Sequence, residues 1–254
     1  MTDNHIHIGQ FEDIYYDGLE VVETVMSCGM DGLAFSSTTS CVDDVRYLDV
    51  EREIQNFLKQ ARYDSEIVRP FFWYIPDYID QGINIQSAFN AVPYKGIKIH
   101  PYINHWDFEE KRHMEILHNL FDYAARNSLP VLIHTGHSGI DSADRFERFF
   151  KEYKKVQCIL AHCRPLDITV KMLKEYNNIF CDTAFVSKED ILHIINSGYR
   201  EKIIFGTDFP ITHYFKTKYP REGENSAITL IEQYKEDIFV FDEILEQGLK
   251  NYEI

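Results

Sequence analysis

The sequence predicts a parallel (β/α)8 barrel, the TIM-barrel class of α/β fold, formed by a single domain over residues 1–254. Eight short apolar runs alternate with longer helical patterns, and such alternation requires parallel strands with helices packed outside them. The chain length of 254 residues is close to the roughly 250 residues typical of this fold. An open doubly wound sheet is the alternative, but no Gly-x-Gly-x-x-Gly turn follows the first run.

The first half of the chain contains four of the expected strands. They are the segment around His5 and His7 and residues 32–35, 67–75 and 96–100. Helices are expected between them at residues 18–29, 43–62 and 78–91. Pro76 and Pro101 mark the ends of the third and fourth strands, because proline has no backbone N–H to donate within a sheet.

Two more strands are expected to end at His134 and His162. Asp107 and Glu110 predict an N-terminal capping box for the helix that precedes the first of them. Behind that box, apolar side chains repeat at helical spacing: Met114, Leu117, Phe121 and Ala124. A further helix is expected between the two strands, over residues 142–155.

The last two strands are expected at residues 179–185 and 203–207, and helices at residues 187–201 and from about residue 225 onward. Pro165 is expected to start the sixth helix, because a missing backbone N–H costs least at that position. Ser187 and Asp190 have the spacing of a helix cap. Residues 210–224 form a long connection after the eighth strand.

Composition limits the function classes. The net charge of −15 argues against nucleic acid as the main partner, because a duplex-binding surface needs a basic stripe. Five cysteines without a Cys-x-x-Cys pair indicate neither a disulfide framework nor a zinc finger, and free thiols suit a reducing cytoplasm. No apolar run has the length of a membrane span. Because the first strand begins almost at Met1, we also expect no signal peptide.

Two histidines, His5 and His7, stand two residues apart in the first expected strand. Side chains at this spacing point to the same face of a strand, so both imidazoles reach toward one point. The pair alone is a weak signal, but three other expected strands also end in a histidine or aspartate: Val131-Leu132-Ile133-His134, Ile159-Leu160-Ala161-His162 and Ile203-Ile204-Phe205-Gly206-Thr207-Asp208. Barrel closure would place strand 8 about 4.8 Å from strand 1, and therefore Asp208 beside His5 and His7.

These residues resemble the motifs of the amidohydrolase superfamily, in particular its amidohydrolase-2 branch of TIM-barrel metal-dependent hydrolases. The resemblance runs from residue 3 to the eighth strand and rests on five parts of the chain: His5-Ile6-His7, Gly96-Ile97-Lys98-Ile99-His100-Pro101, His134, His162 and Gly206-Thr207-Asp208-Phe209-Pro210. It implies a barrel that holds a divalent metal at the carboxyl end of its strands. It also implies hydrolysis or decarboxylation of a small molecule.

Carried over residue by residue, the resemblance makes His5, His7, His134 and Asp208 metal ligands. His162 becomes a catalytic group beside the metal, and Asp208 also accepts the proton of a metal-bound water. Three imidazoles and one carboxylate suit zinc with an open position, which lowers the pKa of bound water to roughly 7. Mn²⁺, Fe²⁺ and Co²⁺ fit the same ligands. The alternative role for His162 is a buried histidine bonded to a backbone carbonyl.

Lys98, His100 and Arg164 are the expected substrate-binding residues. Lys98 would face the cavity as a cation for an anionic substrate, or fill the barrel in an internal salt bridge. In two-metal members of the superfamily a carboxylated lysine at this strand bridges the metals, but we favour one metal. Arg164 follows directly after His162 and Cys163 and would bind a substrate carboxylate, or lie on the surface. His100 lies on the same strand face as Lys98.

The leading function is therefore metal-dependent hydrolysis of a small, anionic amide, lactone or ester. The alternative is a metal-dependent non-oxidative decarboxylase of the same superfamily. A DNase-like hydrolase and a non-catalytic metal-binding barrel are less favoured. We expect a small-molecule substrate and no nucleic-acid or membrane partner, and leave a homo-oligomer open. The 210–224 connection carries Lys216, Lys218 and Arg221, and would serve as a lid or as a subunit contact.

Overall fold

The structure is a computed structural model that describes residues 1–61, 63–137 and 139–250, with side chains as far as residue 243. Its strands are β1 (Thr2–Phe11), β2 (Ile14–Tyr16), β3 (Gly32–Ser37), β4 (Val68–Trp73), β5 (Gly96–Ile99), β6 (Val131–His134), β7 (Cys158–Ala161), β8 (Ile179–Asp182) and β9 (Ile203–Ile204). Its α-helices are α1 (Gly18–Ser27), α2 (Tyr47–Ala61), α3 (Ile85–Ala91), α4 (Lys111–Asn127), α5 (Glu147–Glu152), α6 (Leu166–Glu175), α7 (Lys188–Asn196), α8 (Ile211–Lys218) and α9 (Leu230–Lys250).

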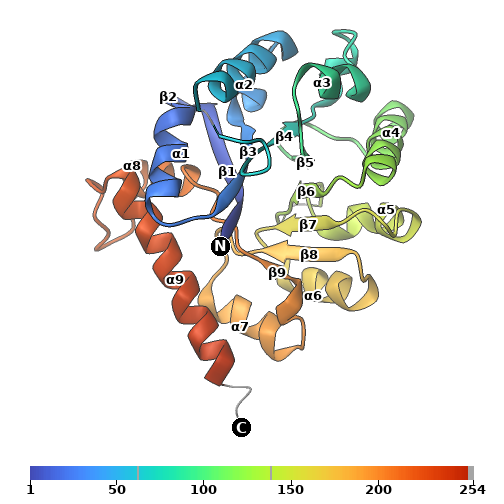
Figure 1. Ribbon diagram of the computed structural model, residues 1–254. Helices are drawn as coiled ribbons and strands as arrows, with labels where there is room; N and C mark the ends of the chain where they lie inside the picture. Colours follow the sequence, from blue (N-terminus) through green and yellow to red (C-terminus); the bar gives the residue numbers. More distant parts are fainter. Residues whose placement is uncertain (62, 138, 251–254) are drawn as a thin grey trace.

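The strands form one curled sheet in the order β2-β1-β3-β4-β5-β6-β7-β8-β9. All neighbouring pairs are parallel except β1 with β2, which form an antiparallel hairpin at the edge. Backbone hydrogen bonds join β1 to the segment after β9: Asn4 N–H to Phe205 O (3.0 Å), Asp208 N–H to His5 O (2.8 Å) and His7 N–H to Phe209 O (2.8 Å). The α-helices surround the strands (Figure 1). The predicted (β/α)8 barrel is therefore confirmed.

The strands of the barrel are buried on both faces. Every residue of β3, β5 and β7 is buried, as parallel strands covered by helices require. The helices are amphipathic, and α2 buries one stripe made of Tyr47, Val50, Ile54 and Phe57. The polar exceptions inside the barrel are therefore informative, because a buried charge needs a partner or a function. Lys98 on β5 is such an exception, with 1% of its surface exposed.

The predicted capping box at Asp107 and Glu110 is wrong. The helix α4 starts at Lys111, and Glu110 is its N-cap without a side-chain hydrogen bond. The Asp107 carboxylate instead accepts the N–H of Glu109 at 2.8 Å. Aspartate side chains commonly form such local turns, so the helix begins only after this turn. By contrast, Ser187 caps α7 as predicted, accepting the N–H of Asp190 at 3.1 Å.

Several predicted connections differ from those in the structure. The expected helix at 78–91 is divided into a 3-10 turn, Pro76–Ile79, and α3, and the one at 142–155 into a 3-10 turn, Ala143–Phe146, and α5. Pro165 is the N-cap of α6 and not its first residue. The connection over residues 210–224 contains α8. The strand β2 was not predicted, and the expected end of a helix at residue 62 lies outside the described residues.

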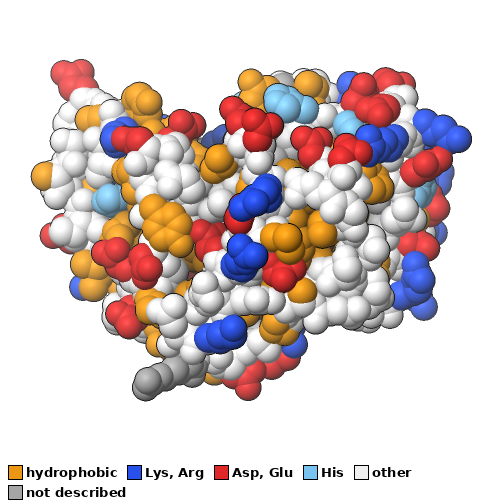
Figure 2. All heavy atoms as spheres, turned by 90° about the horizontal axis from the view of Figure 1, so that it is seen from above, with side chains coloured by type: hydrophobic (Ala, Val, Ile, Leu, Met, Phe, Trp, Pro, Cys, Tyr) orange, Lys and Arg blue, Asp and Glu red, His pale blue; other side chains and the backbone are white. Residues whose placement is uncertain are grey.

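The charged surface and the state of the cysteines agree with the expectations from composition. Acidic and basic side chains are interspersed on the face shown in Figure 2, and the outline of the molecule is notched along its upper edge. All five cysteines are free thiols. Among the helices described, none is both long and apolar enough to cross a membrane.

Candidate metal centre

Three predicted ligands, His5, His7 and Asp208, meet at the carboxyl end of the barrel. The histidines lie on β1 and the aspartate follows β9, so barrel closure brings them together. The Nε2 atom of His7 lies 2.8 Å from Asp208 Oδ1, and that of His5 lies 3.3 Å from the same oxygen. The ligand atoms of all three lie within 4.8 Å of one another. All three residues are buried.

The hydrogen bonds behind the two histidines favour one tautomer of each. His5 Nδ1 lies 2.7 Å from Asp182 Oδ2, and His7 Nδ1 lies 3.2 Å from the backbone oxygen of Ser36 and 3.1 Å from its hydroxyl. The carboxylate and the backbone oxygen can only accept, which favours a proton on each Nδ1 and a lone pair on each Nε2. These two Nε2 atoms are 3.2 Å apart and face a carboxylate oxygen. Such a set of buried electron-pair donors fits a divalent cation.

Lys98 reaches the same point from β5. Its Nζ lies 2.9 Å from His5 Nε2 and 5.6 Å from the centre of a Trp73 ring. Burial lowers the pKa of Lys98, although nearby carboxylates oppose this effect. Burial alone would raise the pKa of Asp208, but the imidazoles of His5 and His7 bring it below its usual range. Asp208 is therefore ionised at neutral pH.

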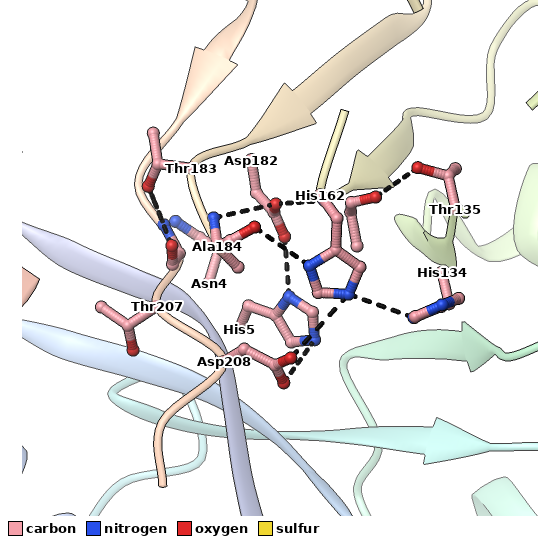
Figure 3. Close-up of polar contacts among 12 residues, drawn as sticks. Asn4, His5, His134, Thr135, His162, Asp182, Thr183, Ala184, Thr207 and Asp208 are labelled. Carbon is pink, nitrogen blue, oxygen red and sulfur yellow. Dashed lines mark hydrogen bonds and ion pairs between the residues drawn. The ribbon is translucent and has the colours of Figure 1, made fainter. Parts of the chain in front are cut away.

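His162 lies beside this cluster, directly after β7. Its Nδ1 donates to the backbone oxygen of Ala184 at 3.0 Å, so its Nε2 is free to accept. That Nε2 lies 3.8 Å from Asp208 Oδ2 and 3.1 Å from His134 Nδ1. Figure 3 marks both contacts with dashed lines. Burial lowers the pKa of His162 to about 4. His162 therefore makes the hydrogen bond to a backbone carbonyl that is expected of a structural histidine. It also presents an unprotonated Nε2 to the site.

His134 was predicted as a metal ligand, and the structure places it next to the cluster. It ends β6, and its Nδ1 contacts His162 as described. Its Nε2 lies 3.8 Å from Asp141 Oδ2, and its ring stacks on that of His100 with 3.6 Å between centroids. Within the described residues, the group with ligand atoms in mutual reach is His5, His7 and Asp208. His134 therefore joins a metal at this centre only if its side chain turns.

Asp182 is a site residue that the motif analysis missed. Besides His5, its carboxylate accepts the backbone N–H of His162 at 2.9 Å and of Ala184 at 3.2 Å. Burial raises its pKa to about 6, although the neighbouring His162 opposes the shift. The signal was present, because the apolar run Ile179-Phe180-Cys181-Asp182 ends in an aspartate as the other site strands do. Asp182 positions both His5 and His162.

Asp3 is a second residue that was missed. It is fully buried, and its carboxylate accepts the N–H of His5 (3.0 Å), the N–H and hydroxyl of Thr207 (3.2 and 2.7 Å) and the hydroxyl of Tyr234 (3.0 Å). Burial raises its pKa to about 7. Asp3 connects β1, the segment before Asp208 and α9. It lies two residues before His5, but the register of β1 shifts between Asp3 and Ile6, so the alternation that identifies His5 and His7 does not identify Asp3.

A cavity of about 820 Å³ opens above the cluster. Its lining includes all three predicted substrate-binding residues, Lys98, His100 and Arg164, together with His162 and Asp208. It extends to residues of α8 and α9. Its volume suits a small molecule.

Comparisons with solved structures show the same fold. The chain is similar to a probable 2-pyrone-4,6-dicarboxylic acid hydrolase from Acinetobacter baumannii with citric acid bound, at 11% identity and a TM-score of 0.60, covering 98% of this chain and 94% of that one. It is similar to Metarhizium anisopliae IDCase in apo form, at 10% identity and a TM-score of 0.63, covering 97% and 91%. It is also similar to YJJV, a TatD homolog from Escherichia coli K12, at 14% identity and a TM-score of 0.58, covering 99% and 95%.

Comparison with family models tests family membership, which similarity of fold alone does not show. The model described as Amidohydrolase matches residues 45–240, which is more than half of the chain and includes His134, His162 and Asp208. A search of curated proteins gave no match. The predicted resemblance is confirmed, and the chain belongs to the amidohydrolase family.

Proposed function

We propose that this enzyme is a metal-dependent hydrolase of a small, anionic amide, lactone or ester. The observation that carries the proposal is the pair of Nε2 lone pairs, on His5 and His7, that converge on the Asp208 carboxylate. A divalent metal at these atoms would supply an activated water and polarise the scissile carbonyl. Zinc suits imidazole and carboxylate ligands, and Mn²⁺, Fe²⁺ and Co²⁺ are the alternatives.

Residues of the chain would supply proton transfer and substrate binding. Asp208 directs Oδ1 toward the histidine pair and Oδ2 toward His162, so one carboxylate serves as ligand and as proton acceptor. His162, neutral at pH 7 because burial lowers its pKa to about 4, accepts or returns a proton at Nε2. Lys98 and Arg164 supply positive charge on the cavity wall, which favours an anionic substrate.

We propose one metal per chain. Lys98 Nζ lies 2.9 Å from His5 Nε2, so an unmodified amine here donates to the lone pair that the metal would take, and a bound metal would replace this hydrogen bond. A carboxylated Lys98 with a second metal is the alternative arrangement.

The five free cysteines support the cytoplasm as the location of the protein, and the cavity supports a small molecule as the substrate.

Decarboxylation is the second candidate function. It is favoured by the position of Lys98, whose cationic group beside the metal ligands would bind a substrate carboxylate. In that reaction the C–CO₂ bond breaks and a proton must be delivered to the carbon left behind. Hydrolysis instead removes a proton from water. The same residues therefore fit both reactions, and the products distinguish them.

The test is a screen of the metal-loaded protein against small amides, lactones, esters and aromatic carboxylates. Hydrolysis releases an acid and consumes water without CO₂, whereas decarboxylation releases CO₂. The proposal expects hydrolysis that is lost in the His5→Ala variant. Release of CO₂ without hydrolysis would favour the alternative. The absence of both reactions, with metal bound, would contradict an enzymatic role for this centre.

A further inference from the structure

We infer that the cavity contains a second binding site, between α8 and α9, that takes the ammonium group of a small primary amine. Thr212, Gln233 and Asp237 form this site, and all three line the cavity. None of them belongs to the metal centre. The inference therefore goes beyond the proposed function, since it assigns a different ligand group to different residues.

Asp237 on α9 is a carboxylate without a counterion. Over the side chains that the structure describes, it makes no ion pair, and Lys216 on the neighbouring helix pairs with Glu236 instead. Burial raises the pKa of Asp237 to about 7, and the carboxylates of Asp3 and Glu236 add to the shift. A charge held away from water is costly unless a partner offsets it. A cation bound beside Asp237 would supply that partner.

Gln233 offers a second acceptor one helical turn before Asp237. It is 5% exposed, and its Nε2 donates to Asp237 Oδ1 at 2.9 Å. Its Oε1 makes no hydrogen bond to the part of the chain that the structure describes, although buried acceptors are rarely left without a donor. Thr212 Oγ1 on α8, which lies beside α9 in Figure 1, donates to the other Asp237 oxygen at 3.2 Å. A ligand that only donates hydrogen bonds fits this set of oxygens.

Apolar side chains beside these oxygens favour an alkyl amine over an inorganic cation. Phe205 and Phe241 pack with 4.7 Å between ring centroids. Both line the cavity, as do Val240 on α9 and Phe215 on α8. An alkyl chain gains free energy by covering such surface, whereas a hydrated metal ion does not. An ammonium group brings N–H donors and no acceptor, and it is attracted to aromatic rings.

Equilibrium binding to the purified protein at pH 8 tests the site with two probes of equal length. Butylammonium carries three N–H donors and a charge, whereas 1-butanol carries one O–H donor and no charge. KCl in the buffer screens the attraction of the net charge of −15 for any cation. We expect butylammonium to bind about tenfold more tightly, the size of one hydrogen bond to a charged group. Equal affinity for the two probes, or binding of neither, would overturn the inference.

Substitutions assign the preference to its residues. Asp237→Asn should abolish the preference for butylammonium over butanol, because it removes the charge and nearly keeps the shape. Gln233→Met, an unbranched replacement, should reduce the preference severalfold. Asp242→Asn on α9 and Gln60→Met on α2, both at exposed positions, are the matched controls that keep it. Thermal melting identifies a variant that fails to fold, and the remaining variant then carries the test. A preference unchanged in both site variants would contradict the assignment.

A third kind of probe identifies the source of the ammonium group. Linear ω-amino acids of increasing length join an ammonium to a carboxylate. If one of them binds Zn²⁺-loaded protein more tightly than butylammonium and more tightly than its own fatty acid, the ammonium is one end of a molecule that reaches the metal centre. If none binds more tightly than butylammonium, the site takes a separate amine. Both results keep the site.

The outcome is separable from that of the proposed function, because no measurement of the site needs turnover. A preference for butylammonium that follows Asp237 would stand even if no substrate were hydrolysed. Hydrolysis together with equal affinity for butylammonium and butanol would keep the hydrolase proposal and refute the ammonium site.

Discussion

At the residue scale, the site depends on where each proton is held. The Asp182 carboxylate and the Ser36 backbone oxygen accept from Nδ1 of His5 and His7, which favours a lone pair on each Nε2 before any metal arrives. The backbone oxygen of Ala184 accepts from Nδ1 of His162 in the same way. The proposed ligands and the proposed catalyst therefore differ in geometry: His5 and His7 face the centre of the cluster, whereas His162 faces its edge. This difference leads to two predictions.

Replacing His162 should separate catalysis from metal binding. Because its Nε2 is 3.8 Å from Asp208 Oδ2 and outside the group of mutual ligands, His162→Ala should leave the metal content near that of wild type. Turnover should fall by the roughly 10²–10⁴-fold typical of losing a general acid or base. Metal analysis and steady-state kinetics on one preparation measure both effects. A metal-free His162→Ala protein would show that His162 is a ligand and would favour the two-metal arrangement.

Replacing Asp182 should weaken the metal centre indirectly. Asp182→Asn can present an amide N–H to His5 Nδ1 where a carboxylate accepted one, so the favoured imidazole tautomer changes. Loss of such a supporting carboxylate typically costs about 10–100-fold in metal affinity. Competition with a chelator measures the dissociation constant. Asp43→Asn, at an exposed position, is the control, and equal affinity in both variants would contradict the positioning role.

At the element scale, the contact between α8 and α9 closes the cavity on one side. Asp237 on α9 accepts a hydrogen bond from Thr212 Oγ1 on α8 at 3.2 Å and from Gln233 Nε2 at 2.9 Å. Burial raises the pKa of Asp237 to about 7. Because α8 also carries Phe215, the stability of this contact affects the shape of the cavity. The charge state of Asp237 should therefore affect the free energy of unfolding of the whole protein.

The pH dependence of unfolding tests this contact. A carboxyl group with a raised folded-state pKa holds its proton between about pH 4 and pH 7 when folded but not when unfolded, so its contribution to stability falls as pH rises through that window. Wild type should lose on the order of 1 kcal/mol relative to Asp237→Asn between pH 5 and pH 8, a value reduced for partial exposure. Denaturant unfolding at several pH values measures the difference. Parallel curves for the two proteins would refute the assignment.

At the scale of the whole molecule, the barrel and the meeting of its first and last strands could be predicted from sequence. Apolar runs that alternate with helical patterns are local signals, and closure then forces Asp208 toward His5 and His7. The side-chain pairing of His134 could not be predicted, because it depends on how Asp141 and His162 pack around it. Neither could α8, since its few buried residues, Ile211 and Tyr214, give only a weak periodic signal.

The same scale explains why Asp3 and Asp182 were missed. Both are single carboxylates beside stronger motifs, and their role lies in bonds to backbone N–H groups of distant segments. A motif identifies which atoms bind a ligand. The packing of separate segments decides which atoms hold those ligands in place, so the aspartate that ends the run 179–182 marks a candidate without showing which histidine it supports.

Metal content per chain tests the central claim most directly. We predict that wild-type protein retains about one divalent metal after gel filtration, and that His5→Ala and His7→Ala each lose it, because removal of either imidazole leaves two of the three converging donors. His193→Ala, an exposed histidine on α7, should retain it. Elemental analysis of folded protein gives the count, and anomalous scattering identifies the metal. Retention of the metal in both the His5→Ala and the His7→Ala proteins would contradict the account.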